Sequence, residues 1–192
     1  MGVTIPLAAF EDAPSSHPFQ DDLVLEMPDV AKEQTIVHHL RLNWLASGHG
    51  PDPYGDPHFD LHFLRGSVEE VDAIDCRADK RLPTADKIPA GYGKPELCVN
   101  AMGYHSWPKA DLEPGADFTA SIIMGYFAGN VVFIEPMIAK SALMKKKTFE
   151  LPIAKPRSAG GATTLYPTHM AATWDADAEA YTFELDQLET ID

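Results

Sequence analysis

Three side chains that can bind a metal ion or carry a proton alternate with bulky apolar residues in the segment 57–64. His58, Asp60 and His62 occupy every second position, and the residues between them are Phe, Leu and Phe. In an extended strand, successive side chains point to opposite faces. The segment therefore predicts a strand that buries one face in a core. The other face would present two imidazoles and a carboxylate to a cavity or to solvent.

Further candidates for the same chemistry lie elsewhere in the chain. His49 lies in a loop rich in glycine and proline, His105 lies in a turn-rich stretch, and Glu135 is a carboxylate within an otherwise apolar run. A buried carboxylate needs a partner, and a metal ion is one such partner. Imidazoles and carboxylates bind zinc, iron, manganese and copper, three or four ligands at a time. We therefore predict a site for one of these divalent transition metals, with the ligands His58, His62, His105 and Glu135.

Two other residues are candidates for catalytic roles at this site. Asp60 and His49 would carry protons or orient the ligands. The predicted function is that of a metal-binding β-domain protein with a His/Glu site. Our first hypothesis for its activity is a metal-dependent enzyme of unknown substrate, with a small-molecule ligand, that works through activated water or oxygen chemistry. Two alternatives use the same residues without catalysis. One is a metal-binding or metal-storage protein, and the other is an oligomeric structural or stress-related module whose His/Asp face lines a polar cavity.

The spacing of His58 and His62 limits how they can share one ion. Four residues along a strand span about 13 Å, which is near the outer limit for two imidazoles. The same spacing on a helix is about 6 Å, and Asp56-Pro57 would make a fair helix start. The Phe/Leu/Phe alternation and the early Gly66 favour the strand. We therefore expect either a twisted or bulged strand, or two separate contributions completed by later strands.

Each candidate also has an interpretation without a metal ion. The polar strand face can line a barrel interior through hydrogen bonds, and Glu135 can form a buried ion pair with Arg41, Arg65 or a lysine. His105 can pack against a neighbouring aromatic ring, and His49 can lie at the surface of its loop.

The segments that must position these residues are predicted mainly as strands. Alternating hydrophobicity predicts a strand at 34–44, and glycine and proline make 48–57 a loop. The pair Gly129-Asn130 between two β-rich runs predicts a hairpin. The other predicted elements are a strand at 68–76 (alternatively a short helix), hairpin strands at 118–127 and 131–138, a short helix within 139–147, and a second hairpin at 169–174 and 181–185. The fold class is therefore mainly β, a single antiparallel β-sandwich or barrel with minor helix. An acidic arm at 1–34 would precede one domain at 35–192.

Composition narrows the class of partner. The chain has 192 residues and a net charge of −14, which argues against binding to nucleic acid or an anionic membrane surface. No apolar run approaches the ~20 residues of a membrane helix, so no membrane insertion is expected. The start lacks a basic n-region, so we expect a soluble, cytoplasmic protein as written, or an envelope or exported one if a signal segment was removed.

Two further features bear on assembly and redox state. Cys76 and Cys98 are the two cysteines, and we expect free thiols, with a single bridge as the alternative. Basic residues gather at 140–157 and acidic residues at 175–192. These are either two solvated surfaces or complementary faces of a homo-oligomer.

Several blocks of this sequence resemble a family of prokaryotic proteins of unassigned function. They are Gly48-His49-Gly50-Pro51, Pro57–Phe63, Ile88–Tyr92, Met102–Trp107, Gly125–Gly129 and Phe133–Met137, and the resemblance covers about residues 36–145. One family member is a thermophile protein controlled by an extracytoplasmic sigma factor. Here Leu64 replaces a frequent tyrosine, and Ser106 separates His105 from the following Trp. The resemblance implies a β-rich domain that tends to oligomerise and is usually exported or envelope-associated, with no settled activity.

Overall fold

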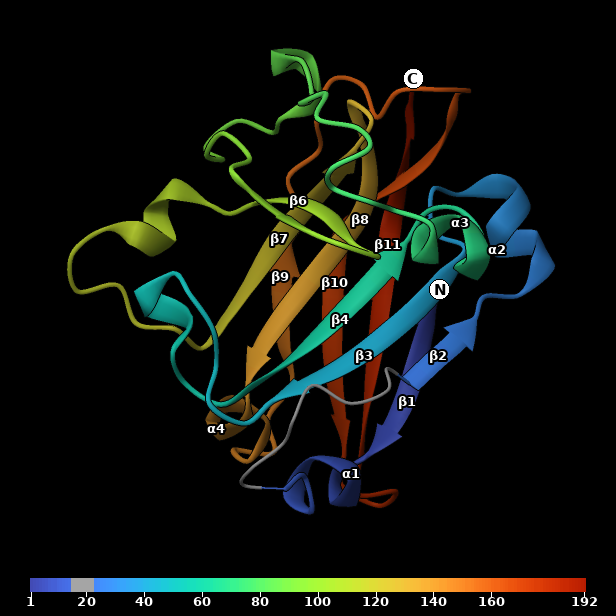
Figure 1. The fold of residues 1–192 in the computed structure, drawn as a ribbon. Coiled ribbons are helices and arrows are strands. Elements are labelled where there is room, and N and C mark those ends of the chain that lie inside the picture. The colour runs from blue at the N-terminus through green and yellow to red at the C-terminus, as the bar shows by residue number, and fades with distance from the viewer. Residues whose placement is uncertain (15–22) are drawn as a thin grey trace.

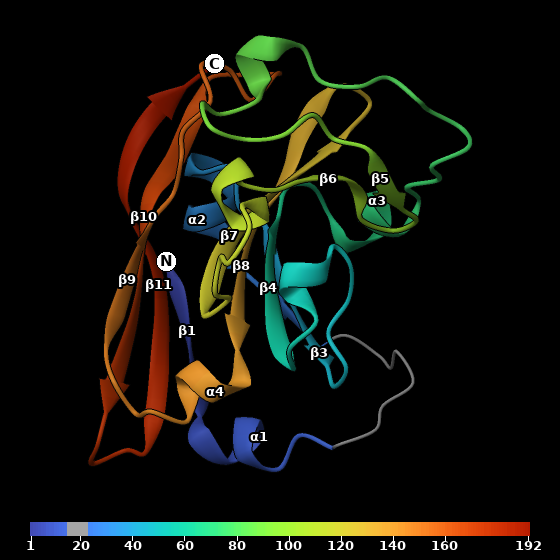
Figure 2. The ribbon, with the colours of Figure 1, turned by 90° about the vertical axis from the view of Figure 1, so that its left-hand side faces the viewer.

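Two antiparallel sheets pack face to face in the computed structural model, which describes residues 1–14 and 23–192 (Figure 1). Figure 2 shows the smaller sheet on one side, the larger sheet in the middle, and a layer of loops over the far face of the larger sheet. The prediction of a mainly β protein is thereby confirmed, in the form of a β-sandwich.

The smaller sheet has the strand order β1-β11-β10-β9. Its strands are β1 (Gly2–Pro6), β9 (Phe149–Pro152), β10 (Thr164–Asp175) and β11 (Ala180–Ile191). The predicted hairpin at the C-terminal end is confirmed, since β10 and β11 pair along their whole length. Met170, Ala172, Phe183 and Leu185 alternate inward and are fully buried, whereas Trp174 is only partly buried.

The larger sheet has the strand order β2-β3-β4-β8-β7-β6-β5. Its strands are β2 (Leu23–Glu26), β3 (His39–Leu45), β4 (His58–Leu64), β5 (Leu97–Val99), β6 (Gly103–Ser106), β7 (Ala120–Phe127) and β8 (Asn130–Ala139). The β7–β8 hairpin is confirmed. Ala128 and Gly129 at its turn have φ of 49° and 79°, the left-handed pair that a two-residue hairpin turn requires.

Both sheets recruit the segment that was expected to be an acidic arm. Within residues 1–34, β1 pairs with β11 and β2 pairs with β3. The strand predicted at 34–44 begins only at His39, because Gln34 ends a helix and the next residues contact the smaller sheet instead: Thr35 forms a bridge with Leu165, and the Ile36 N–H donates to the Leu165 carbonyl at 3.0 Å.

Short helices connect the strands. The α-helices of the described chain are α1 (Leu7–Glu11), α2 (Asp29–Gln34), α3 (Val68–Asp72) and α4 (Lys140–Leu143). Its 3-10 helices are η1 (Asp52–Tyr54), η2 (Ala85–Lys87) and η3 (Lys109–Leu112). No helix in these described residues is long and apolar enough to cross a membrane.

The strand predicted at 68–76 was wrong, and the alternative of a short helix is confirmed, because helix α3 begins at Val68. Ser67 Oγ accepts from the Glu70 N–H at 3.2 Å, and the Glu70 carboxylate accepts from the Ser67 N–H at 2.8 Å. This reciprocal capping box satisfies two of the donors that a helix start leaves open. The local pair therefore outweighs the β-type alternation of the following residues.

The expectation of free thiols was also wrong. Cys76 and Cys98 form a disulfide, with their Cα atoms 5.9 Å apart. The Cys76 N–H donates to the Asn100 side chain at 3.0 Å, and the Ala101 N–H donates to the Ile74 carbonyl at 2.9 Å. These contacts hold the chain after α3 beside β5, so the two sulfurs meet across the loop layer.

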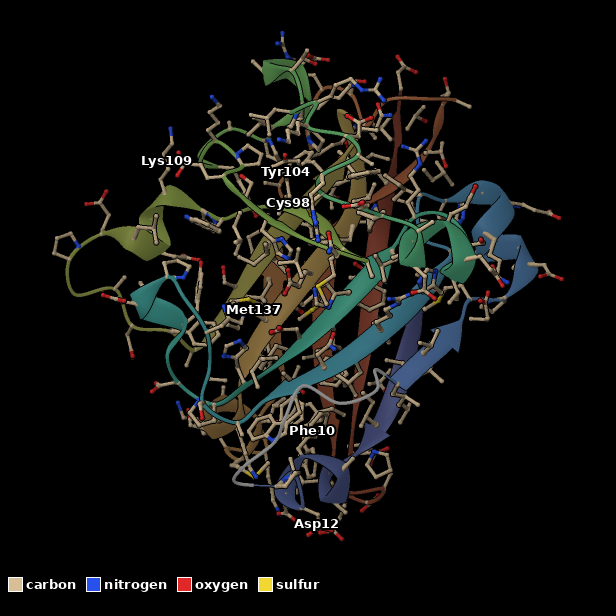
Figure 3. The ribbon with its side chains drawn as sticks, viewed as in Figure 1. Phe10, Asp12, Cys98, Tyr104, Lys109 and Met137 are labelled. Atoms are coloured by element: carbon tan, nitrogen blue, oxygen red, sulfur yellow. A yellow bond between two sulfur atoms is a disulfide. The ribbon has the colours of Figure 1, made fainter. Side chains whose placement is uncertain are left out.

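The main core lies between the two sheets. Phe59, Leu61 and Phe63 of β4 point into it and are at most 3% exposed. Phe10, labelled in Figure 3, packs edge-on against Phe59 at 4.8 Å and against Phe183 of the smaller sheet at 6.0 Å. Each such side chain stabilises the fold by about 1.5–3 kcal/mol relative to exposure.

The outer face of the larger sheet is buried as well. A second apolar cluster lies on it, with members that include Leu64 and Met137 from the sheet and Tyr54, Ile74 and Phe118 from the covering loops. All seven residues of β4 are consequently buried. The polar face of β4 therefore looks into a covered layer rather than into solvent.

Candidate metal centre

Sheet register brings the polar residues of three strands together on this outer face. Between the pairs Asp60–Met137 and Phe63–Ile134, the register of β4 and β8 places Glu135 opposite His62. His105 lies further along the sheet on β6, opposite Gly125 of β7. The register of β7 and β8 shifts between Gly125 and Tyr126, where Val132 of β8 has no opposite residue; this marks a bulge in β8 beside Phe133, and bulges bend a strand and re-aim its side chains.

His62, His105 and Glu135, here called the His62 triad, each offer a ligand atom within 4.8 Å of the other two. His62 Nε2 lies 3.3 Å from Glu135 Oε1, and the rings of His62 and His105 are 6.5 Å apart. Both ring nitrogens of His62, as well as Glu135 Oε2, are buried and make no hydrogen bond with any residue that the structure describes. Leaving a buried polar atom unpaired costs about 1–3 kcal/mol, so these atoms call for a ligand.

The two imidazoles of the His62 triad are held in the form that binds metals. Burial lowers the pKa of His62 to about 3 and that of His105 to about 4. His105 Nδ1 lies 3.1 Å from the Gly103 carbonyl, which can only accept, so Nδ1 carries the hydrogen and Nε2 keeps its lone pair. Neutral imidazole is the ligand form, and a second hydrogen bond that fixes its tautomer is typical of metal sites.

The pKa of the carboxyl group in the His62 triad shifts in the opposite direction from the pKa values of the two imidazoles. Burial, followed by repulsion from the Asp60 charge, raises the pKa of Glu135 well above its ordinary value. Glu135 is 1% exposed. A nearby cation would favour the ionised form that this burial disfavours.

Phe133 supports both imidazoles, and Gly125 makes room for it. The Phe133 ring lies edge-on to His62 at 5.1 Å and to His105 at 4.9 Å. A Cβ atom on Gly125 would lie only 2.0 Å from this ring. These two residues escaped the sequence reasoning, although a glycine inside an apolar strand signals a close approach.

A second group lies beside the first on the same face. His49, His58 and Asp60, here called the His58 triad, again offer ligand atoms within 4.8 Å of one another. The Asp60 carboxylate lies 3.2 Å from His58 Nε2 and 3.7 Å from His49 Nε2. Burial acts to raise the pKa of Asp60, but the contacts with His49 and His58 outweigh it and hold this pKa well below its usual range. Burial lowers the pKa of His49, but Asp60 outweighs it and the net shift is upward.

The structure distributes the predicted residues over both triads. Three of the predicted ligands, His62, His105 and Glu135, come together. His58 lies apart from them, with Asp60 and His49, which were predicted as proton carriers or orienting groups. The cause is the spacing of four residues on a regular strand, which separates His58 from His62.

The two arginines that the sequence offered as ion-pair partners of Glu135 contact other groups. Arg41 contacts Asp72 at 2.7 Å, and Arg65 donates to the carbonyls of Ala159 and Gly160 at 3.3 and 2.6 Å. Glu135 instead faces His62.

A small cavity touches both triads. Its volume is about 20 Å³, enough for roughly one water molecule. His49 of one triad and His105 and Glu135 of the other line it, together with Trp107 and Met137. Met137, labelled in Figure 3, lies on β8 under the loop layer.

Comparison with known proteins gives a limited result. A family model described as "TTHB210-like: Hypothetical protein TTHB210" matches residues 1–44. Neither curated proteins nor solved structures gave a match. The matched segment lies almost wholly before the blocks at 36–145 that carry the sequence resemblance. This chain is therefore similar, over its first 44 residues, to an uncharacterised protein family.

Proposed function

We propose that this protein binds a divalent transition metal ion through His62, His105 and Glu135. One observation carries the proposal: both ring nitrogens of His62 and one oxygen of Glu135 are buried and unpaired among the described residues. A cation bound by a His62 ring nitrogen and a Glu135 oxygen would give both groups a partner at once.

The donor set supports a reactive rather than a closed site. Two imidazoles and one carboxylate bind iron in many oxygenases and zinc in several hydrolases, and in both classes further coordination positions stay open. An ion so held supplies Lewis acidity and an activated water. His105 and Glu135 line a cavity of about 20 Å³, so a ligand that reaches the ion there is about the size of water. We therefore propose a metal-dependent enzyme with a very small substrate.

The small cavity also supports one competing function. A metal-binding or metal-storage protein uses the same ligands but needs no room for a substrate. Deep burial of His62 and Glu135, at 2% and 1% exposure, suits such a closed site. An ion with a bound water that small anions displace supports catalysis, whereas a coordinatively saturated ion supports storage.

Elemental analysis of untagged protein, loaded with Zn²⁺, Fe²⁺, Mn²⁺ or Cu²⁺ and then dialysed, tests the proposal. His105→Ala should lose about one ion per chain relative to wild type. The matched control is His169→Ala, because His169 contacts Asp186 at 2.7 Å outside both triads. If wild type retains no metal, or if His105→Ala and the control retain equal amounts, the proposal is wrong.

A further inference from the structure

We propose that His49, His58 and Asp60 form a second metal site, so that the folded chain holds two ions. This inference goes beyond the proposed function, which concerns the His62 triad alone. The second site uses side chains that the first site does not use. Like the first site, it consists of two imidazoles and one carboxylate.

Unpaired buried atoms point to a ligand in the His58 triad. His58 Nε2 and Asp60 Oδ1 are 3.2 Å apart, yet neither makes a hydrogen bond with any residue in the described part of the chain. His58 is fully buried and Asp60 is 4% exposed. Two atoms that approach this closely without aligning for a hydrogen bond can both direct lone pairs at a shared cation.

Hydrogen bonds on the far side of each ring fix the tautomers. His58 Nδ1 lies 2.7 Å from the Asp56 carbonyl, and His49 Nδ1 lies 2.8 Å from the Gly50 carbonyl. A carbonyl only accepts, so each Nδ1 carries a hydrogen and each neutral ring has a lone pair on Nε2. Both Nε2 atoms lie next to Asp60, at 3.2 Å for His58 and 3.7 Å for His49. A cation that displaces the proton held between His49 and Asp60 would meet two lone pairs and a carboxylate. A divalent cation satisfies all three, and this arrangement is the usual one for metal-bound histidine.

The loop before β4 holds His49 in place. The His49 N–H donates to the Tyr54 carbonyl at 3.0 Å, and the Tyr54 hydroxyl donates to Asp111 at 2.7 Å. Gly48 permits this tight path, since a Cβ there would lie 2.3 Å from the Tyr54 carbonyl oxygen. The rings of His49 and His58 consequently pack edge-on at 4.8 Å. The His58 triad therefore combines His49, from a loop held by hydrogen bonds, with His58 and Asp60, from a buried strand.

The two ions are neighbours but are not bridged by one oxygen atom. Asp60 and His62 are successive residues on one face of β4, about 6.6 Å apart along the strand. Bridged pairs of ions in two-metal enzymes are closer, at about 3.5–4 Å. The small cavity is lined by His49 on one side and by His105 and Glu135 on the other. A water-sized ligand in this cavity is therefore within reach of both sites.

Zinc stoichiometry, measured by calorimetric titration and elemental analysis, tests the second site. Wild type and the control His169→Ala should bind two ions per chain. His49→Ala and Asp60→Asn should each bind one, and each should retain the ion that His105→Ala loses. The double variant His49→Ala/His105→Ala should bind none.

The outcomes separate this inference from the proposed function. If wild type binds one ion that His105→Ala removes and His49→Ala retains, the second site is wrong and the first stands. If His49→Ala loses an ion and His105→Ala does not, the second site stands and the first is wrong. Circular dichroism confirms folding, and His49→Ala changes a partly exposed loop residue, so the test remains available if Asp60→Asn unfolds.

Discussion

A methyl group added at Gly125 should disturb the metal centre without touching any ligand. In Gly125→Ala the new Cβ would lie 2.0 Å from the Phe133 ring. Carbon atoms in contact prefer about 3.5–4.0 Å, so the ring must move by roughly 1.5 Å. Overpacking of this kind costs about 1–3 kcal/mol. At about 2–4 °C per kcal/mol for a chain of this size, the melting temperature should fall by about 2–12 °C.

The same displacement should weaken metal binding at the His62 triad. Phe133 contacts both His62 and His105, so moving the ring releases the imidazoles from their positions. Loss of such support around a metal site typically weakens affinity by about 10–100-fold. Calorimetric titration with Zn²⁺ should show this loss for one ion only.

Two further variants test whether the effect of Gly125→Ala comes from its contact with Phe133. The control is Gly93→Ala, because a Cβ at Gly93 would meet its nearest neighbour at an ordinary 3.7 Å. Replacing the ring by Phe133→Leu should remove most of the stability cost of Gly125→Ala, since the clash has lost its partner. If Gly125→Ala melts and binds zinc as the control does, the described packing around Phe133 is wrong.

Three other perturbations have defined outcomes. Chelation should lower the melting temperature, because an ion at 100 times its dissociation constant stabilises the fold by about 2.7 kcal/mol; an unchanged melting curve would argue against any bound metal. Reduction of the Cys76–Cys98 bridge, which closes a loop with a sequence separation of 22, should cost about 3 kcal/mol in urea titrations. The variant Cys76→Ser/Cys98→Ser should then melt like the reduced protein, and equal stability of reduced and oxidised wild type would contradict the pairing. Burial lowers the pKa of His39 below its unfolded value, so its contribution to stability is full above a pH of about 6.5 and is lost as the pH falls. The apo-protein should therefore melt at a lower temperature at a pH of about 5.5 than at a pH of about 7.5. The melting temperature of His39→Gln should depend less on pH. An equal pH dependence in both proteins would refute this role of His39.

Local patterns in the sequence were sufficient for the strands that carry the chemistry. Phe59, Leu61 and Phe63 alternate with polar residues, and β4 has the bounds that this alternation predicted. The glycine-containing turn at 128–130 likewise predicted the β7–β8 hairpin. Such features depend on neighbours along the chain, so a single sequence contains the information needed.

Features that depend on distant partners could not be predicted in the same way. Glu135 meets His62 only because of the register between β4 and β8, which alternation alone does not specify. The pairing of Cys76 with Cys98 depends on how the loop after α3 crosses the outer face. The four-residue spacing indicated that His58 and His62 cannot share an ion without a twisted or bulged strand, but it did not predict two separate groups. Only the covering loop supplies His49 as a partner of His58.

Anomalous X-ray diffraction from crystals grown with Zn²⁺ tests the central claim most directly. The account predicts a peak about 2.0–2.2 Å from His62 Nε2, His105 Nε2 and a Glu135 carboxylate oxygen. Zinc peaks confined to surface carboxylates, with His62 and Glu135 left without an ion, would contradict it.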